Sequence, residues 1–238
     1  MGTDTADAAE FSRHLAALKD DGCNVLVVND PNGAADICDH LLGGHDLERR
    51  HVYLPTTTDV DDVLARHEPR RTTQNALGVA DATAATTTRS VAATSGTATA
   101  TAGPSLDTQP GSAWYSDIDD LTDLETVFDA VHDHVDRIAP QTPAPGELRL
   151  CVDSLDPFFD AADEQTLFRF IHGLTNLVRK HDGMGHYHAA AGTGHPTVAV
   201  LEPLFDATVY VETTIDGDTR QRWRLHDPDI VSDWMPLD

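Results

Sequence analysis

The chain has 238 residues, which is enough for one hydrophobic core of good size. It carries 40 Asp and Glu residues against 16 Lys and Arg residues, for a formal net charge of −24. Such a surface repels a phosphate backbone, so the composition excludes non-specific nucleic-acid binding. Asp is abundant and the only lysines are Lys19 and Lys180. This balance is typical of a halophilic cytoplasm, where concentrated salt screens the repulsion between like charges.

The N-terminal sequence is polar and acidic, which is unlike a signal peptide, and no apolar run approaches the roughly 18 residues of a membrane span. We therefore expect a cytoplasmic protein with no membrane partner, and residues 1–10 to be frayed. Cys23, Cys38 and Cys151 have no paired spacing, so we expect them to be reduced thiols that pack in the core.

Strand and helix patterns alternate through the first third of the chain. In chain order they predict a helix over Phe11–Leu18, a strand over Cys23–Val28, a helix over Ala34–Leu42, a strand over His51–Leu54, a helix over Thr58–His67 and a weaker strand over Ala76–Ala82. From Ala84 to Gly111 the sequence is mainly Thr, Ala, Ser and Gly. Such a segment buries too little apolar surface to offset its ordering entropy, so residues 84–111 are predicted to be a disordered insert. The alternative is a functional lid.

Regular patterns resume after the insert. A helix is predicted from a capping box at Thr122 and Glu125 to a stop before Pro140, and then a buried strand over Leu148–Val152. A long helix follows, with Asp160 and Asp163 as candidate caps. Its apolar stripe contains Leu167, Phe168, Ile171, Leu174 and Val178, widened by Phe170 and Leu177. The remaining predicted elements are a strand over His186–Ala190, a short helix over Pro196–Phe205 and a hairpin of strands over Ala207–Thr213 and Arg220–Leu225.

This order of elements predicts an α/β fold. We expect one domain over residues 1–238, built as a three-layer sandwich: a mostly parallel central sheet with helices on both faces and a C-terminal antiparallel hairpin.

The turn after the first strand is where a phosphate-binding loop would lie. Such a loop reads G-x-x-x-x-G-K-[ST], and its backbone amides and lysine hold phosphate. Here the segment Asn29–Asp36 contains Gly33, but Ala35 stands in place of the lysine and Asp36 in place of the hydroxyl. The acidic side chains add repulsion, so this loop is degenerate as a phosphate site.

The order of elements, the strand that ends in Asp153-Ser154 and this degenerate loop together resemble the RecA/KaiC-like superfamily of P-loop proteins. The segment from Leu150 to Phe205 is similar to uncharacterised halophilic archaeal proteins described as HTR-like. The resemblance covers nearly the whole chain apart from the insert.

The resemblance implies that Asp153 matches the Walker B aspartate, which would hold magnesium, and that Ser154 follows it in the motif. Pro55, Thr56 and Thr57 stand where relatives of KaiC type keep acids that activate water. The leading hypothesis is therefore a catalytically inactive domain, without a cofactor or catalytic residues, that acts as a regulatory or signalling interaction module. Its partner would be an unidentified protein or a second copy of the chain. The alternative is a weak nucleotide-binding ATPase relative that uses Asp153 and magnesium.

Thirteen histidines also raise the question of a metal site. His186 and His188 share one face of a predicted strand, with His181 and His195 nearby in sequence, so a histidine-based metalloenzyme is a second alternative. No cysteine or acid completes a recognisable ligand spacing, and the sequence alone assigns no metal site. A Ser154, His188 and Asp206 triad lacks the G-x-S-x-G elbow that would support it.

Overall fold

Short apolar segments of the chain form the strands of one central sheet. The structure is a computed structural model that describes residues 3–29, 34–43, 48–67, 74–86, 112–191 and 194–237. The strands are β1 (Cys23–Asn29), β2 (Arg50–Leu54), β3 (Leu77–Asp81), β4 (Tyr115–Asp117), β5 (Leu148–Val152), β6 (Met184–Ala189), β7 (Ala207–Thr213), β8 (Thr219–Leu225), β9 (Ile230–Val231) and β10 (Met235–Pro236).

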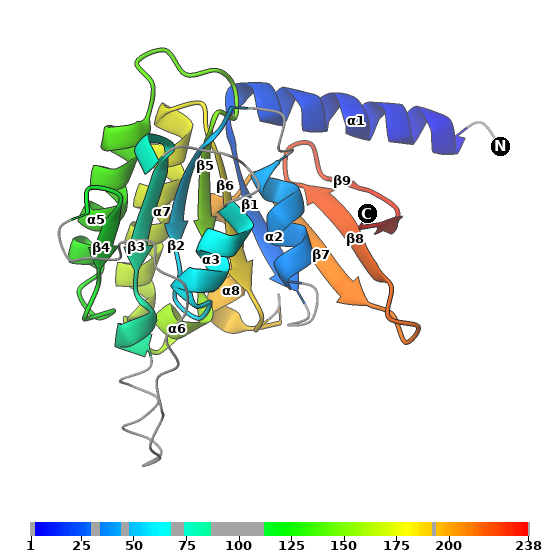
Figure 1. Ribbon diagram of the computed structural model, residues 1–238. Coiled ribbons are helices and arrows are strands. Elements are labelled where there is room, and N and C mark those ends of the chain that lie inside the picture. The colour runs from blue at the N-terminus through cyan, green and yellow to red at the C-terminus, as the bar shows by residue number, and fades with distance from the viewer. Residues whose placement is uncertain are drawn as a thin grey trace.

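In the described part of the chain these strands form a ten-stranded sheet in the order β10-β8-β7-β1-β6-β5-β2-β3-β4, with β9 paired to β8. The strands from β7 to β4 in this order are mutually parallel. The C-terminal strands pair antiparallel to one another. The predicted mostly parallel sheet with a C-terminal antiparallel hairpin is therefore confirmed (Figure 1).

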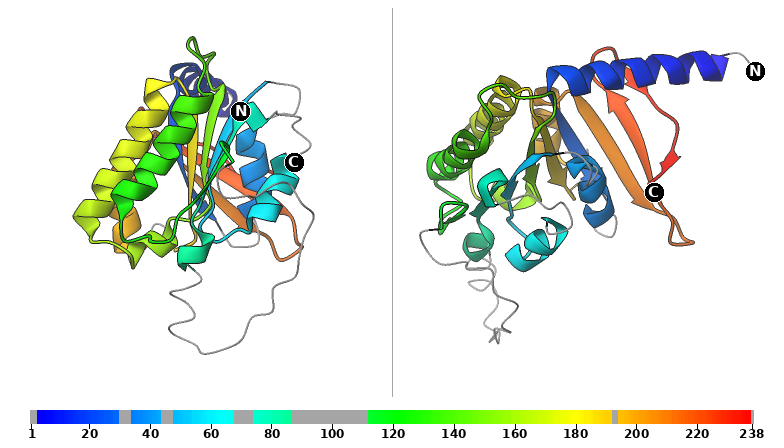
Figure 2. Two further views of the ribbon diagram at one scale, coloured as in Figure 1. Left: turned by 60° about the vertical axis from the view of Figure 1, so that its left-hand side comes forward. Right: turned by 45° about the horizontal axis from the view of Figure 1, so that its top comes forward.

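Helices cover both faces of the sheet, as predicted (Figure 2). Helices α5 (Leu124–Ile138) and α7 (Glu164–Lys180) lie on one face, and α2 (Ala34–Leu42) and α3 (Val60–His67) lie on the other. The remaining helices are α1 (Thr3–Asp21), α6 (Asp156–Phe159), α8 (Pro196–Leu201) and the short 3-10 helices η3 (Gln74–Ala76) and η4 (Glu202–Leu204). None of the helices in the described ranges is both long and apolar enough to cross a membrane.

The apolar residues of helix α7 pack it against the central sheet. Its buried residues follow the predicted stripe and pack with strand residues such as Leu150 and Val152 in the largest core cluster. Phe168 is the exception, because 37% of its surface is exposed and its ring stacks on His172. Its assignment to the buried stripe was therefore wrong. Phe170 and Leu177, which were predicted to widen the stripe, are both buried.

Two further local predictions are corrected by the structure. The first helix is longer than predicted, because α1 begins at Thr3 and includes residues that were expected to be frayed. Helix α5 is capped by Asp123, whose side chain accepts from the amide of Thr126. Thr122 does not serve as the cap because its own amide and hydroxyl both donate to Asp120.

The predicted insert lies mostly outside the described residues. Residues 84–86 are described, and they continue a helical turn that begins at Thr83. Ala85 is 4% exposed and belongs to the main core cluster. Residues 87–111 are not among those described, so their predicted disorder stays a prediction.

Candidate functional site

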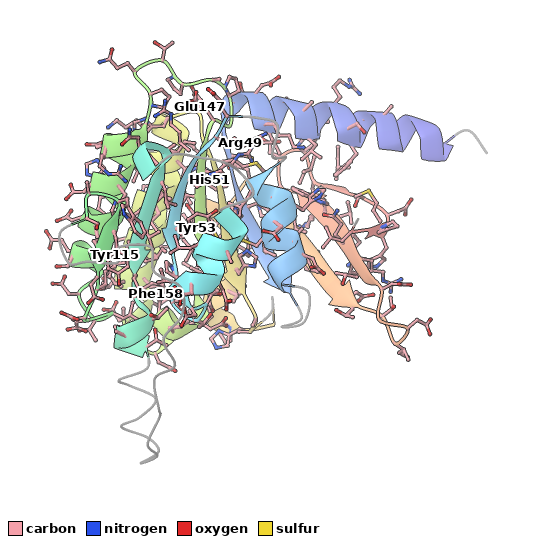
Figure 3. All side chains as sticks on the ribbon, in the orientation of Figure 1. Arg49, His51, Tyr53, Tyr115, Glu147 and Phe158 are labelled. Carbon is pink, nitrogen blue, oxygen red and sulfur yellow. The ribbon has the colours of Figure 1, made fainter. Side chains whose placement is uncertain are left out.

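The carboxyl ends of the parallel strands form the edge where α/β sheets generally bind ligands. Asp153 and Ser154 follow β5 at this edge, beside the end of β2 and the end of β6. Phe158, in the α6 helix that follows, lies at this end of the sheet, whereas Arg49 and Glu147 lie at the opposite end (Figure 3). The predicted Walker B-like residues therefore occupy the position that a ligand site requires.

The Asp153 carboxylate is bound by the loop that follows β2. Its Oδ1 accepts from the amide and hydroxyl of Thr56, at 2.6 and 2.7 Å. Its Oδ2 accepts from the amide and hydroxyl of Thr57, both at 3.0 Å, and from the amide of Thr58 at 2.6 Å. Hydrogen bonds to an ionised acceptor are among the strongest in proteins. Five donors therefore surround the carboxylate that the resemblance assigns to magnesium.

Ser154 and Asp156 form a second anchor beside the first. The Ser154 hydroxyl donates to Asp156 Oδ2 at 2.8 Å. The two oxygens of Asp156 also accept from the amides of Ala190 and Ala191, both at 2.9 Å. These bonds fix the chain that leaves β6, so this carboxylate also has a structural role.

An open cavity of about 690 Å³ lies next to these residues. Ser154, Asp156 and Asp160 line it, together with Thr57 and Thr86. Among the described residues that line it there are two carboxylates and no cationic side chain. A phosphate group would therefore meet negative charge without a compensating lysine or arginine.

The degenerate phosphate loop is described only at its two ends. Asn29 is the last residue of β1, while Ala35 and Asp36 lie in the first turn of α2. Asp36 is exposed. Gly33 lies outside the described residues. Asp36 is an acidic residue in the first turn of α2, so its charge would oppose the binding of a phosphate anion at this helix N-terminus.

Two cysteines and two histidines meet inside the domain, on the sheet face covered by α2 and α3. One sulfur or ring-nitrogen atom from each of Cys38, Cys151, His186 and His188 lies within 4.8 Å of the others. The Cys38 sulfur is 3.5 Å from the Cys151 sulfur and 3.4 Å from His186 Nε2. All four residues are buried, with exposed fractions of 0 to 4%.

The surroundings of Cys38 in this cluster change the acidity of its thiol. The pKa of the Cys38 thiol is well below its usual range, chiefly because of the hydrogen bond from Cys151. Burial acts in the opposite direction, while the neighbouring His186 lowers the pKa further. By contrast, burial raises the pKa of the Cys23 thiol, which lies outside the cluster, to about 12. Thiolate character is the property that metal binding and redox chemistry both use.

Residues 22–211 match the family described as "Family of unknown function (DUF7504)". The chain belongs to the DUF7504 family. No curated protein matches it.

The DUF7504 match runs from the residue before β1 into β7. It therefore contains Asp153, Ser154 and all four residues of the Cys/His cluster, whereas the whole of α1, β8, β9 and β10 lies outside it.

The structure separates other residues that sequence reasoning considered together. The Cys/His cluster includes neither His181, which follows the end of α7, nor His195, which precedes α8 and stacks on Phe159. The suggested triad is also dispersed, because Ser154 follows the carboxyl end of β5 while Asp206 accepts from the amide of Asn24, near the start of β1.

Sequence reasoning missed the cysteines of the cluster because they lie far from the histidines along the chain. Cys38 and Cys151 are 113 positions apart, and Cys38 and His186 are 148 positions apart. The one usable signal was the pair His186 and His188 on a single strand face, next to the buried strand that contains Cys151.

Proposed function

We propose that this chain is a RecA/KaiC-like α/β domain that has lost nucleotide chemistry and serves as a regulatory or signalling protein-interaction module. The observation that carries the proposal is the fivefold hydrogen bonding of Asp153. A magnesium ligand must present carboxylate oxygen to the ion, and here both oxygens serve to hold the β2–α3 loop.

The charges at this edge support the same conclusion. Ala35 contributes no cation, Asp36 adds an anion, and the neighbouring cavity is lined by Asp156 and Asp160. The carboxyl ends of β1 and β5 meet at one edge of the sheet, as a phosphate loop and a metal-binding acid would require. We therefore propose that the chain retains the strand arrangement of a nucleotide-binding domain but lacks the cationic groups that bind phosphate.

Calorimetric titration with Mg-ATP in molar KCl tests the loss of nucleotide chemistry. We expect no binding heat and no hydrolysis by the wild-type chain. Micromolar affinity that disappears in Asp153→Ala and persists in Asp129→Ala, a control at an exposed position of α5 away from the cavity, would contradict the proposal and favour the weak ATPase.

The interaction role needs a separate test. Light scattering in molar KCl measures self-association, and affinity capture at the same salt concentration provides candidate partners whose binding is then measured with purified proteins. We expect a saturable complex, either with another protein or between two copies. A chain that stays monomeric and binds none of the captured proteins after purification would contradict this part of the proposal.

A further inference from the structure

The Cys/His cluster joins three elements of the fold. Cys151 in β5 and His186 in β6 are directly paired across neighbouring strands. His188 lies two residues further along β6, so its side chain leaves the same face of the sheet. Helix α2 lies over this face and contributes Cys38. Tyr53 in β2, which pairs with Cys151, marks this part of the sheet in Figure 3.

The donor atoms have the spacing of a tetrahedral site. With zinc bonds of about 2.3 Å to sulfur and about 2.0 Å to nitrogen, tetrahedral geometry separates two sulfurs by roughly 3.8 Å and a sulfur from a nitrogen by roughly 3.5 Å. The corresponding separations here are 3.5 Å between the two sulfurs and 3.4 Å between Cys38 and His186. The remaining donors lie within 4.8 Å of one another. Small side-chain movements would therefore complete the coordination.

We propose that Cys38, Cys151, His186 and His188 form a structural metal site that binds one divalent ion of the zinc type. Two thiolates and two imidazoles are a ligand set typical of zinc. Two thiolate charges also neutralise a dication, which removes the cost of burying a net charge in the core.

The burial of the ligands indicates a structural site. A catalytic zinc keeps one coordination position open for water or substrate, whereas a structural zinc has four protein ligands. Here four protein donors converge, and their surroundings include the apolar side chains of Leu42, Val63 and Val79. The ion would fasten α2 to β5 and β6. It would thus order the helix that follows the degenerate loop without any bound phosphate.

A disulfide between Cys38 and Cys151 is the competing outcome. Its bond length is about 2.0 Å, so the two sulfurs, now 3.5 Å apart, would have to approach each other. A disulfide would use two of the four donor groups, whereas a metal ion uses all four. The convergence of both histidines on the thiols therefore favours the metal.

Cobalt binding tests the site in the full chain, prepared without a histidine tag, reduced and freed of metal by chelation. Added Co²⁺ should produce visible absorption of tetrahedral cobalt together with a near-ultraviolet thiolate-to-cobalt band, saturating at one ion per chain. Zn²⁺ should abolish both signals by displacement. At a zinc concentration about a thousandfold above the dissociation constant, the melting temperature should rise by roughly 10 °C.

Cysteine variants assign the signal. Cys38→Ser and Cys151→Ser should each lose the thiolate band and weaken cobalt binding at least 100-fold. The control is Cys23→Ser, which removes the other buried cysteine and should leave both the band and the stoichiometry unchanged. If the cluster variants fail to fold, the wild-type spectrum decides. Cys38 and Cys151 are the pair of cysteines in contact, so a two-thiolate spectrum supports the site.

Several results would overturn the proposal. One is an octahedral cobalt spectrum without a thiolate band, which would point to histidines at the surface. Another is zinc stabilisation of equal size in wild type and Cys38→Ser. A third is rapid formation of a Cys38–Cys151 disulfide in protein that has been saturated with zinc.

Discussion

At the scale of single residues, several carboxylates of this acidic chain bind its own backbone. Asp81, at the end of β3, accepts from the amide and hydroxyl of Thr83 and from the hydroxyl of Tyr115. Asp153 and Asp156 hold the loops that follow β2 and β6 in the same way. Acidic residues at this edge therefore shape the loops, and their number alone is not a sign of catalysis.

His134 should make stability depend on pH. It is 5% exposed, its ring lies 2.9 Å from the Ser116 hydroxyl, and burial, aided by the charge of Arg137, lowers its pKa from 6.5 to about 4. Between these values the unfolded chain binds a proton that the folded chain does not. The contribution of neutral His134 to the free energy of unfolding is therefore fully present above pH 6.5 and is lost as the pH falls towards 4. Its total is about 2 to 3 kcal/mol.

Denaturant unfolding of wild type and His134→Gln from pH 7.5 to 4.5 measures this contribution. The stability of wild type should fall relative to the variant as the pH decreases. A constant difference between the two proteins over this range would show that His134 does not titrate as described.

Gly78 should be sensitive to a single added methyl group. A Cβ atom at this position in β3 would lie 2.6 Å from the Cβ and 2.9 Å from the Cγ of His134. Because α5 is packed closely on β3 here, Gly78→Ala should lower the free energy of unfolding by about 1 to 3 kcal/mol. Gly194→Ala is the control, since a Cβ there meets nothing within 4 Å. Equal effects of the two substitutions in denaturant titrations would argue against this close packing.

At the scale of elements, the sequence predicted those with strong periodicity. The apolar run Leu148–Val152 and the stripe of α7 predicted β5 and the helix that follows it. The strand β4 was missed because its three residues, Tyr115–Asp117, are at most partly buried and show no alternation. The two-residue strands β9 and β10 are too short to give any pattern.

The candidate site was likewise predicted only in part. The position of Asp153 at the end of β5 followed from the strand pattern, but its hydrogen bonds to the β2–α3 loop are tertiary contacts across about a hundred residues. The Cys/His cluster likewise depends on how α2 packs on the sheet. Contacts of this kind are not encoded in local spacing.

Replacement of residues 87–111 tests whether that segment is a passive insert. Thr86 and Ser112 are the described residues at its two ends. The amide of Thr86 donates a hydrogen bond to the carbonyl of the buried residue Ala82. Closing a loop costs little more entropy when the loop is long, so a short Gly/Ser linker should leave the melting temperature within a few degrees of wild type. Aggregation of the shortened chain, or loss of its partner, would show that the segment is an organised part of the protein.

At the scale of the whole molecule, the chain has far more carboxylates than basic side chains that could pair with them. The described arginine-carboxylate pairs are few: Arg50–Glu147, Arg179–Asp206, Arg220–Glu212 and the contacts of Arg224 with Glu202 and Asp229. A net charge of −24 must therefore be balanced mainly by ions in solution.

Salt should control the stability of the fold. The Debye length is roughly 3 Å in 1 M salt and exceeds 10 Å below 0.1 M, so repulsion between surface carboxylates grows as salt is removed. Circular dichroism across a KCl series should show a falling melting temperature and expansion or unfolding at roughly 0.05 M. An unchanged melting temperature over this series would contradict the predicted halophilic character of the surface.

We propose that Asp153 stabilises the fold and does not bind magnesium. This role is tested by the free energy of unfolding of wild type, Asp153→Asn and the exposed control Asp129→Asn, each measured with and without Mg-ATP in molar KCl. We predict that Asp153→Asn loses about 2 kcal/mol or more without any ligand, because donors in Thr56, Thr57 and Thr58 lose a charged acceptor. Asp129→Asn should match wild type, and Mg-ATP should change none of the three. Equal stability of wild type and Asp153→Asn without ligand, with stabilisation of wild type alone by Mg-ATP, would contradict this account.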